Sequence, residues 1–301
     1  MINNLHKPIM VDEILSFVSN DKELSVLDCT FGGGGHTLSF LDRGHQVTAI
    51  DQDLNAQEIA NNIKFKYKKF NFFKMNFKDL ERLNDNHSKN KFDFILLDLG
   101  FSSNQLEDIK IGISFKENSN LNMNYLNSNI TAYDIINKYS EDELSRVFAE
   151  YGEINQSTKL AKFIVKSRND KSINTNFELI EVLRNSRINF RSKKIHFATQ
   201  AFQALRIECN KELENLTIFL TKIFNFINKD GILAIISFHS LEDRIVKNYF
   251  KSNFFKKDTY INQKNWGYQI MTKKPITPSE MEISINPRSR SSKLRVGRFV
   301  N

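Results

Sequence analysis

Residues 24–36 read Leu24-Ser25-Val26-Leu27-Asp28-Cys29-Thr30-Phe31-Gly32-Gly33-Gly34-Gly35-His36, an apolar run that ends in an acid and continues into four consecutive glycines. The apolar run predicts a buried β-strand, and glycine lets a backbone approach a ligand closely at any φ. A second apolar run, residues 46–50, ends in Asp51, where an open α/β sheet offers a carboxylate to ribose hydroxyls. Together the two segments predict a site for a ligand with an adenosine end.

The spacing of the glycines narrows the identity of this ligand. No Lys-Ser/Thr pair follows the loop, so the P-loop pattern G-x-x-x-x-G-K-[ST] is not met, and the last glycine of G-x-G-x-x-G falls on Thr37. A dinucleotide rests its pyrophosphate on a helix N-terminus. Asp28, beside the loop, is expected to repel a pyrophosphate and to attract a cation. These features favour S-adenosylmethionine, with NAD as the alternative.

Composition indicates the class of protein and its partners. The length of 301 residues allows roughly two domains of about 150 residues. A net charge of +8 favours a polyanionic partner such as nucleic acid, the alternative being a solvated basic surface. Two cysteines, without any Cys/His cluster at ligand spacing, predict reduced thiols and no metal site. The longest apolar run, residues 232–236, is far shorter than the roughly 20 residues that span a bilayer. We therefore expect a cytoplasmic protein without membrane contact.

The order of apolar runs predicts an α/β fold with an insertion. Short strand-like runs alternate with helical patterns, which is typical of a parallel sheet covered on both faces. The expected strands are 24–29, 46–50, 72–75, 92–97, 231–238 and 293–300, and the expected helices are 10–19, 36–42, one from 54, and a long one over 199–227. Residues 104–130 lack a period, and 131–186 are helical throughout, with capping-box patterns at 140–143 and 175–178. We predict a first domain part over 1–105, an inserted helical domain over 106–197, and a second domain part over 198–301.

Asp98 is the second acid at a strand end. It closes the fourth expected strand, at the carboxyl edge where open α/β sheets bind ligands. The run Asp98-Leu99-Gly100-Phe101 is comparable to the D/N/S-P-P-Y/F pattern of amino-group methyltransferases. An acceptor oxygen on the N–H groups of an amine such as that of cytosine lets the nitrogen lone pair turn toward a methyl donor, and an aromatic ring holds the base. The alternative is an acid that only caps the strand end.

Further polar residues lie at the same predicted edge or in basic clusters. His239 follows the fifth expected strand and is a candidate catalytic residue, although Ser240-Leu241-Glu242-Asp243 also fits an ordinary helix N-cap. Two basic clusters predict contacts to RNA phosphates, and the alternative is that both are solvated surface. Their members are Arg184, Arg187, Arg191, Lys193 and Lys194, with Phe190 among them, and Arg288, Arg290, Lys293, Arg295 and Arg298.

Five blocks of sequence carry a family resemblance. They are TFGGGGH at 30–36, DLGFSSNQL at 98–106, FQALRI at 202–207, SFHSLEDRIVK at 237–247 and NPRSRSSKLR at 286–295. In this order they resemble the bacterial 16S rRNA cytosine-N4 methyltransferase family, RsmH, also called MraW. The resemblance runs from His6 nearly to the C-terminus.

The resemblance implies a Rossmann-like class I S-adenosylmethionine-dependent methyltransferase sheet with an inserted α-helical, substrate-recognition domain. It implies direct methyl transfer to the exocyclic amine of a cytosine in the decoding (P-site) region of 16S rRNA, with the small ribosomal subunit as partner. The family's cofactor contacts fall on Gly34, Gly35, His36, Asp51, Phe77, Asp98 and Gln105. We take Asp98, Ser102 and His239 as the catalytic candidates.

The chain departs from the family pattern in the expected insertion. Where the family reads L-D-M-R-M this chain has Leu121-Asn122-Met123-Asn124-Tyr125, and Phe197 replaces a proline. The loss of a carboxylate and an arginine motivates a second hypothesis, a ribosome assembly factor that keeps the cofactor pocket without methylating. A small-molecule methyltransferase is a third hypothesis, disfavoured by the basic clusters. The sequence leaves open whether the chain forms a homodimer.

Overall fold

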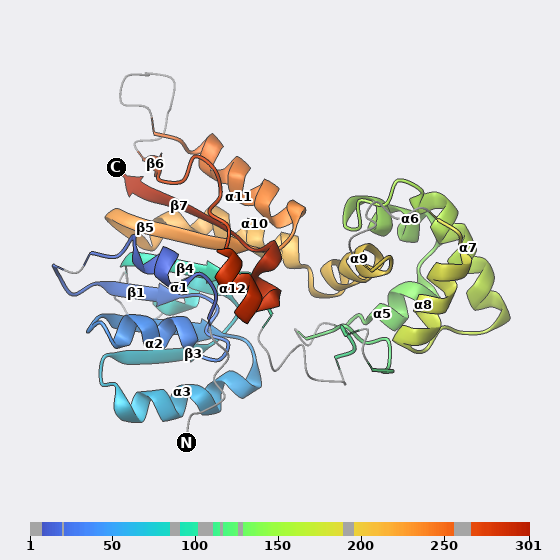
Figure 1. The fold of residues 1–301 in the computed structure, drawn as a ribbon, viewed down its shortest axis with the longest axis horizontal. Helices are drawn as coiled ribbons and strands as arrows, with labels where there is room; N and C mark the ends of the chain where they lie inside the picture. The colour runs from blue at the N-terminus through green and yellow to red at the C-terminus, as the bar shows by residue number, and fades with distance from the viewer. Residues whose placement is uncertain are drawn as a thin grey trace. The chain divides into compact units, whose positions relative to one another are not determined.

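The chain divides into two compact units, each of which is described by itself. The computed structural model describes residues 8–19, 21–84, 91–101, 111–114, 117–125, 129–188, 196–255 and 266–301. The first unit consists of Met1–Phe101 and Glu214–Asn301, and the second of Ser102–Leu213 (Figure 1). The sequence predicts the inserted domain at residues 106–197. The second unit extends beyond that range at both ends.

The first unit is built on a seven-stranded sheet in the order β3-β2-β1-β4-β5-β7-β6. Neighbouring strands from β3 to β5 run parallel, whereas β7 is antiparallel to both β5 and β6. The strands are β1 Ser25–Asp28, β2 Gln46–Asp51, β3 Phe70–Lys74, β4 Phe92–Asp98, β5 Ile227–Ser237, β6 Gly267–Ile270 and β7 Lys293–Val300. The predicted parallel sheet is confirmed; β6 was not predicted, because its four residues show no apolar period.

Helices cover both faces of this sheet, as the sequence predicted. Successive residues of β4 point to opposite faces: Phe94 and Leu96 belong to one core cluster, and Ile95 and Leu97 to the other. The first cluster includes residues of α1, α2 and α3, and the second includes residues of η1, α10 and α11 (Figure 1). These elements are α1 Val11–Leu15, α2 Gly35–Leu41, α3 Leu54–Lys66, η1 Phe77–Asn84, α10 Glu212–Lys222 and α11 Ser240–Ser252.

The second unit is helical around its own buried cluster of apolar side chains. Two capping boxes predicted from the sequence are confirmed, with Ser140 and Thr175 as N-caps and Glu143 and Glu178 as their partners. Its helices are α5 Ala132–Lys138, α6 Glu141–Glu150, α7 Ser157–Asp170, α8 Asn176–Asn185 and α9 Thr199–Asn210. Among the described residues of both units, no helix is long and apolar enough to cross a membrane.

The prediction of one long helix over residues 199–227 is wrong, because the helix is interrupted at Lys211. Lys211 adopts a left-handed φ of 51° between α9 and α10, and a short 3₁₀ turn, η2 Ile223–Asn225, follows α10. Arg206 donates to Glu212 from Nε at 2.9 Å, which ties the last turn of α9 to the start of α10 across the break. The apolar spacing of three and four continues past the break, so the pattern alone did not reveal it.

The helix expected over residues 10–19 is also shorter in the structure. Only Val11–Leu15 is α-helical: the left-handed φ of 53° at Met10 sets its start, and the chain continues as turns over residues 16–18. The backbone N–H of Met10 donates to Glu282 Oε1 at 2.6 Å, in helix α12 Glu280–Ile285. A contact between residues this far apart in the sequence therefore fixes where the first helix begins.

Replacing Gly112 by alanine is expected to destabilise the second unit by about 2 kcal/mol. Gly112 has φ +71°, and a Cβ there would lie 2.4 Å from the backbone oxygen of Asn120. Gly44→Ala is the matched control, since Gly44 has φ +85° and a Cβ there would meet no atom within 4 Å. Thermal and denaturant unfolding measure both variants. Equal losses of stability for the two would contradict a steric role for Gly112.

Candidate active site

The glycine loop joins β1 to α2 and depends on glycine at specific positions. Gly32 and Gly34 have φ of +53° and +78°, in the region that favours glycine. A Cβ on Gly34 would lie 2.8 Å from Ile63 Cδ1, and one on Gly35 would lie 2.9 Å from the Pro8 ring. The loop is therefore a close-packed backbone turn at the carboxyl end of β1, with Pro8 against one side.

Asp51 is the last residue of β2, and its carboxylate is hydrogen-bonded to the glycine loop. Its Oδ2 accepts from the N–H of Gly32 at 2.7 Å, and its Oδ1 accepts from the N–H of Asp53 at 2.9 Å. Burial raises the pKa of Asp51 to about 6, against the lowering effect of these two backbone hydrogen bonds. Further hydrogen-bond donors would stabilise the ionised form of this buried carboxylate. The two hydroxyls of a ribose are such donors. The residue thus fits an adenosine ligand.

Asp28 does not have the role that the sequence suggested. It is fully buried, its Oδ1 accepts from the N–H of Thr30 at 3.1 Å, and its Oδ2 accepts from Thr37 Oγ1 at 2.7 Å. Burial raises its pKa, and the neighbouring His36, Thr37 and Thr30 only partly offset that rise. Asp28 therefore ties the end of β1 to α2, and the expectation that it attracts a cationic ligand directly is not supported by its position.

Asp98 ends β4 in a fixed orientation. Its Oδ1 accepts from the N–H of Gly100 at 3.0 Å, and its own N–H donates to Thr30 Oγ1 at 2.8 Å. Its Oδ2 lies 3.5 Å from Nε2 of His36, which is buried in the first turn of α2. The Asp98 side chain keeps 19% of its surface exposed. The structure thus brings Asp98 and His36 together and leaves the carboxylate accessible.

Gly100 lies under the ring of Phe238. A Cβ on Gly100 would lie 2.7 Å from Phe238 Cζ and 3.1 Å from Asp98 Oδ1. The N–H of Leu99 also donates to the oxygen of Ile236 at 3.0 Å. The segments after β4 and β5 are therefore side by side, as expected for the carboxyl edge of a parallel sheet.

His239 lies at this edge as the N-cap of α11. Its Nδ1 accepts from the N–H of Glu242 at 3.4 Å, and Glu242 Oε2 accepts from the N–H of His239 at 3.3 Å. His239 Nε2 is 3.2 Å from Glu242 Oε1. The cap expected near Ser240 is thus one residue earlier, and capping accounts for the position of His239 without a chemical role.

The other predicted site residues have different outcomes. Phe77 begins η1, shortly after Met75, whose N–H donates to the backbone oxygen of Asp51 at 2.9 Å. The ring of Phe77 packs edge-on against the ring of Phe219, with 5.7 Å between the centroids. Ser102 and Gln105 lie outside the described residues. Thr30, whose hydroxyl accepts from the N–H of Asp98, was not singled out from the sequence. Its position between Asp28 and the first glycine of the loop was the signal that could have identified it.

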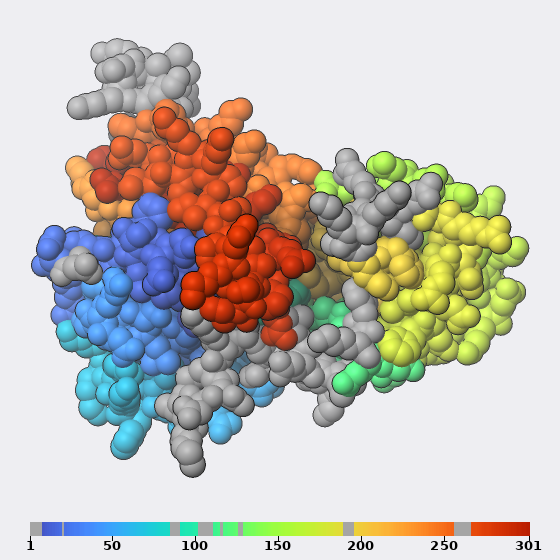
Figure 2. All heavy atoms as spheres, in the orientation of Figure 1, coloured from blue at the N-terminus to red at the C-terminus, as the bar shows by residue number. Residues whose placement is uncertain are grey.

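The basic clusters are only partly surface. Arg295 forms a two-point ion pair with Asp243 of α11, at 2.7 Å and 3.2 Å, and Lys293 lies 3.5 Å from the same carboxylate. Arg288 and Arg290 are exposed on η3 Pro287–Ser291, next to α12, which forms the orange-red surface at the front of Figure 2. Arg191, Lys193, Lys194 and Phe190 lie outside the described residues. Arg295 was therefore wrongly grouped with surface cations.

The arrangement defines a class of protein. A parallel sheet with an antiparallel β7 next to β5, a glycine loop after β1, and acids that end β2 and β4 are the parts of a class I S-adenosylmethionine-dependent methyltransferase, here with an inserted helical unit. The cofactor of this class is S-adenosylmethionine. The chain belongs to the MraW methylase family, whose model matches residues 3–300.

Similar proteins cover the chain almost entirely. It is 41% identical to "Ribosomal RNA small subunit methyltransferase H" of Rickettsia canadensis, over 98% of both chains. It is 39% identical to the protein of the same name from Brachyspira hyodysenteriae, over 98% of this chain and 97% of that one. Among solved structures it is similar to SMU.1697c, a putative methyltransferase from Streptococcus mutans in complex with SAH, with a TM-score of 0.43, 12% identity, and coverage of 98% and 100%. That structural likeness is too weak to carry an argument.

Proposed function

We propose that this protein methylates the small-subunit ribosomal RNA, and that the acceptor is the N4 amine of a cytosine in the decoding (P-site) region of 16S rRNA. The family, and relatives named for the small-subunit rRNA reaction, support the coarser statement. Asp98 is the observation that carries the choice of an amine, because its partly exposed carboxylate is fixed in orientation beside the glycine loop. The reaction takes place in the cytoplasm, where the ribosome is assembled.

The role proposed for Asp98 follows from the chemistry of the acceptor. The exocyclic amine of cytosine is a poor nucleophile, because its lone pair is delocalised into the ring. S-adenosylmethionine supplies an electrophilic methyl group on a sulfonium. Asp98 Oδ2, which lies 3.5 Å from His36 Nε2, would accept an N–H of the amine, since Oδ1 is engaged by Gly100. Phe101 and Ser102 complete the proposed base site, and His239 orients the start of α11 rather than moving a proton.

The proposed cofactor contacts are Gly34, Gly35, His36, Asp51, Phe77, Asp98 and Gln105. Asp51 would hold the ribose hydroxyls, and the aromatic face of Phe77 would lie against the adenine. The loop glycines carry no side chain that would stand between the backbone and a ligand. The absence of a lysine in the loop is consistent with a ligand that has no phosphate. Every contact in this set belongs to the first unit except Gln105.

Cofactor affinity is expected to fall as the pH drops through about 6, the pKa of the Asp51 carboxyl. Hydrogen bonds donated by ribose hydroxyls favour the ionised carboxylate, so binding lowers this pKa and releases a proton at acidic pH. Below pH 6 the affinity for S-adenosylhomocysteine should weaken by up to about tenfold per pH unit, and above pH 7 this group should have no effect. Calorimetry from pH 5 to pH 8 measures the profile. Asp51→Asn should flatten it; a steep profile in that variant would remove Asp51 from the proposed contacts.

The proposed reaction is tested by nucleoside mass spectrometry of small-subunit rRNA from cells with and without this chain. We expect N4-methylcytidine at the decoding region to disappear with the chain and to return with a plasmid copy. Purified protein should also transfer labelled methyl groups to small subunits from the deletion strain. If the protein binds these subunits and S-adenosylhomocysteine but transfers nothing, the assembly-factor hypothesis replaces the proposed reaction.

A further inference from the structure

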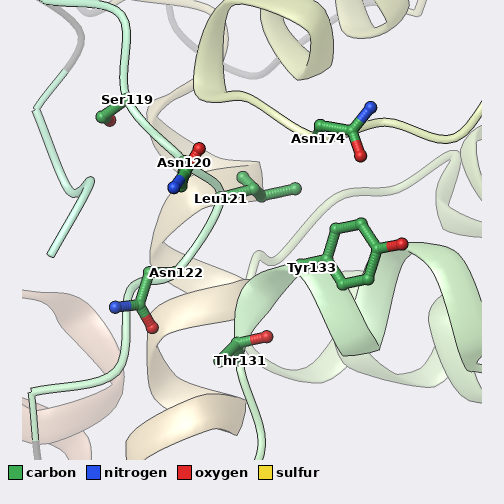
Figure 3. Close-up of a pocket in the computed structure, with 7 residues that line it drawn as sticks. All are labelled: Ser119, Asn120, Leu121, Asn122, Thr131, Tyr133 and Asn174. Carbon is green, nitrogen blue, oxygen red and sulfur yellow. The ribbon is translucent and has the colours of Figure 1, made fainter. Parts of the chain in front are cut away.

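A polar hollow of about 810 Å³ lies within the second unit (Figure 3). It falls in the size range of small-molecule pockets. In Figure 3 the Leu121 side chain points toward the space between the Asn174 amide and the Tyr133 ring. The residues that line it are Ser119, Asn120, Leu121, Asn122, Thr131, Tyr133 and Asn174. None of the proposed cofactor contacts is among them.

The walls of the hollow are fixed by backbone hydrogen bonds. The N–H of Leu121 donates to the oxygen of Asn174 at 2.9 Å, and the oxygen of Leu121 accepts from the N–H of Tyr133 at 2.7 Å. The oxygen of Asn122 accepts from the N–H of Ala132 at 2.7 Å. Residues 120–122 are thus held on one side by the segment before α8 and on the other by the start of α5.

The buried side-chain amide of Asn176 holds the segment that leads into this wall. Asn176 donates from Nδ2 to the backbone oxygens of Ser114 and Glu117, at 2.7 Å and 2.8 Å, and its Oδ1 accepts from the N–H of Ser119 at 3.0 Å. The Ser119 hydroxyl, by contrast, is buried and has no hydrogen-bond partner among the described residues. Its oxygen has almost no accessible surface, so it is part of the wall and is not among the groups that meet a ligand.

The chemistry of the lining selects a neutral, hydrogen-bonding ligand. All seven lining residues are uncharged, although the chain as a whole carries a net charge of +8. A phosphate would need cations here, and a cationic ligand would need acids. An asparagine amide carries donors and an acceptor together, as the edge of a nucleobase requires. Asn174 donates one N–H to the oxygen of Ser172 at 3.0 Å, and in Figure 3 its amide lies above the ring of Tyr133, which is available for stacking.

We propose that this hollow binds one unstacked nucleobase of the acceptor RNA, separate from the base that is methylated. The inference rests on the proposed function, because an RNA acceptor supplies the ligand. Sequence-specific RNA recognition uses splayed bases stacked on aromatic rings and hydrogen-bonded at their edges. Asn122, at which this chain departs from the family's acid, keeps the hollow neutral and so suited to a base.

The experiment measures binding of single-stranded RNA to the full chain with S-adenosylhomocysteine present. The probes are labelled homopolymers of adenosine, cytidine and uridine, about 12 nucleotides long, and an abasic oligomer of the same length. The variants are Tyr133→Leu, which keeps apolar volume, and Asn174→Ala, at an exposed position. Tyr151→Leu is the matched control, because Tyr151 is a half-buried tyrosine of the same unit that does not line the hollow. Thermal unfolding verifies that each variant folds.

We expect Tyr133→Leu and Asn174→Ala to weaken binding of at least one base-containing probe by about tenfold, with no change in the dependence of affinity on salt. Neither variant should alter binding of the abasic oligomer, and Tyr151→Leu should bind all probes as the unaltered chain does. Unchanged affinity for every homopolymer, an equal loss on the abasic oligomer, or a shallower salt dependence would each overturn the inference. The assay measures no methyl transfer, so its failure is distinct from failure of the proposed reaction, which mass spectrometry of the rRNA reports.

Discussion

Asp98→Ala is expected to lower the rate of methyl transfer to small-subunit rRNA by about a hundredfold or more, the loss seen when one oriented polar group is removed from an active site. The carboxylate is held by Gly100 and its backbone is fixed by Thr30, so it meets an acceptor amine without reorganising. Alanine removes the acceptor oxygens and leaves the end of β4 in place. Single-turnover transfer of labelled methyl groups, with calorimetry of S-adenosylhomocysteine, separates chemistry from cofactor binding.

Asp93→Asn is the matched control for this variant. Asp93 is an acid of the same strand, near its amino end, where Oδ2 accepts from the N–H of Ser25 at 3.0 Å and Oδ1 accepts from Asn228 at 3.0 Å. An asparagine there retains an acceptor and changes the charge of β4 by the same amount. We expect its rate to stay within about twofold of the unaltered enzyme, since effects at separated sites are largely independent. Equal losses in the two variants would mean that Asp98 acts only through the stability of the strand.

Asp243→Ala is expected to cost about 3–5 kcal/mol of the free energy of unfolding, because it leaves a nearly buried guanidinium without its partner. The side chains of Arg295 and Asp243 retain only 11% and 14% of their exposure. Burial alone would raise the pKa of Asp243, but the hydrogen bonds and charge of Arg295 and Lys293 lower it. The stabilisation is therefore complete above the ordinary carboxyl pKa and is lost as the pH falls through the lowered one. Denaturant unfolding at pH 7 measures the loss.

The double variant Asp243→Leu/Arg295→Met tests the same pair. Removing both charges avoids an unpaired buried ion, so the double variant should be more stable than Asp243→Ala. Its affinity for single-stranded RNA should keep the salt dependence of the unaltered chain, because Arg295 binds a carboxylate rather than a phosphate. A clearly shallower salt dependence would return Arg295 to the set of RNA contacts.

The success of the sequence-based predictions depended on how local the signal was. The glycine loop, Asp51 and Asp98 were predicted at strand ends, and the structure has them there, because a parallel sheet brings its carboxyl ends to one edge. The capping boxes at Ser140 and Thr175 depend on residues three apart and were predicted correctly. The break at Lys211 was missed because the apolar spacing of three and four continues past it. The cap at His239 was missed because histidine is not among the usual N-cap residues, although its capping box with Glu242 is as local as the other two.

The sequence by itself determined the alternation of strands and helices, the glycine loop and the acids that follow β2 and β4, because each is written in the spacing of neighbouring residues. Only the tertiary structure decided which polar groups remain available for a ligand. Asp28 and Arg295 have the same residue chemistry as Asp98 and Arg290, yet the first two are buried and partnered while the second two are accessible. Burial and partner choice depend on residues far apart in the chain, which no local pattern records.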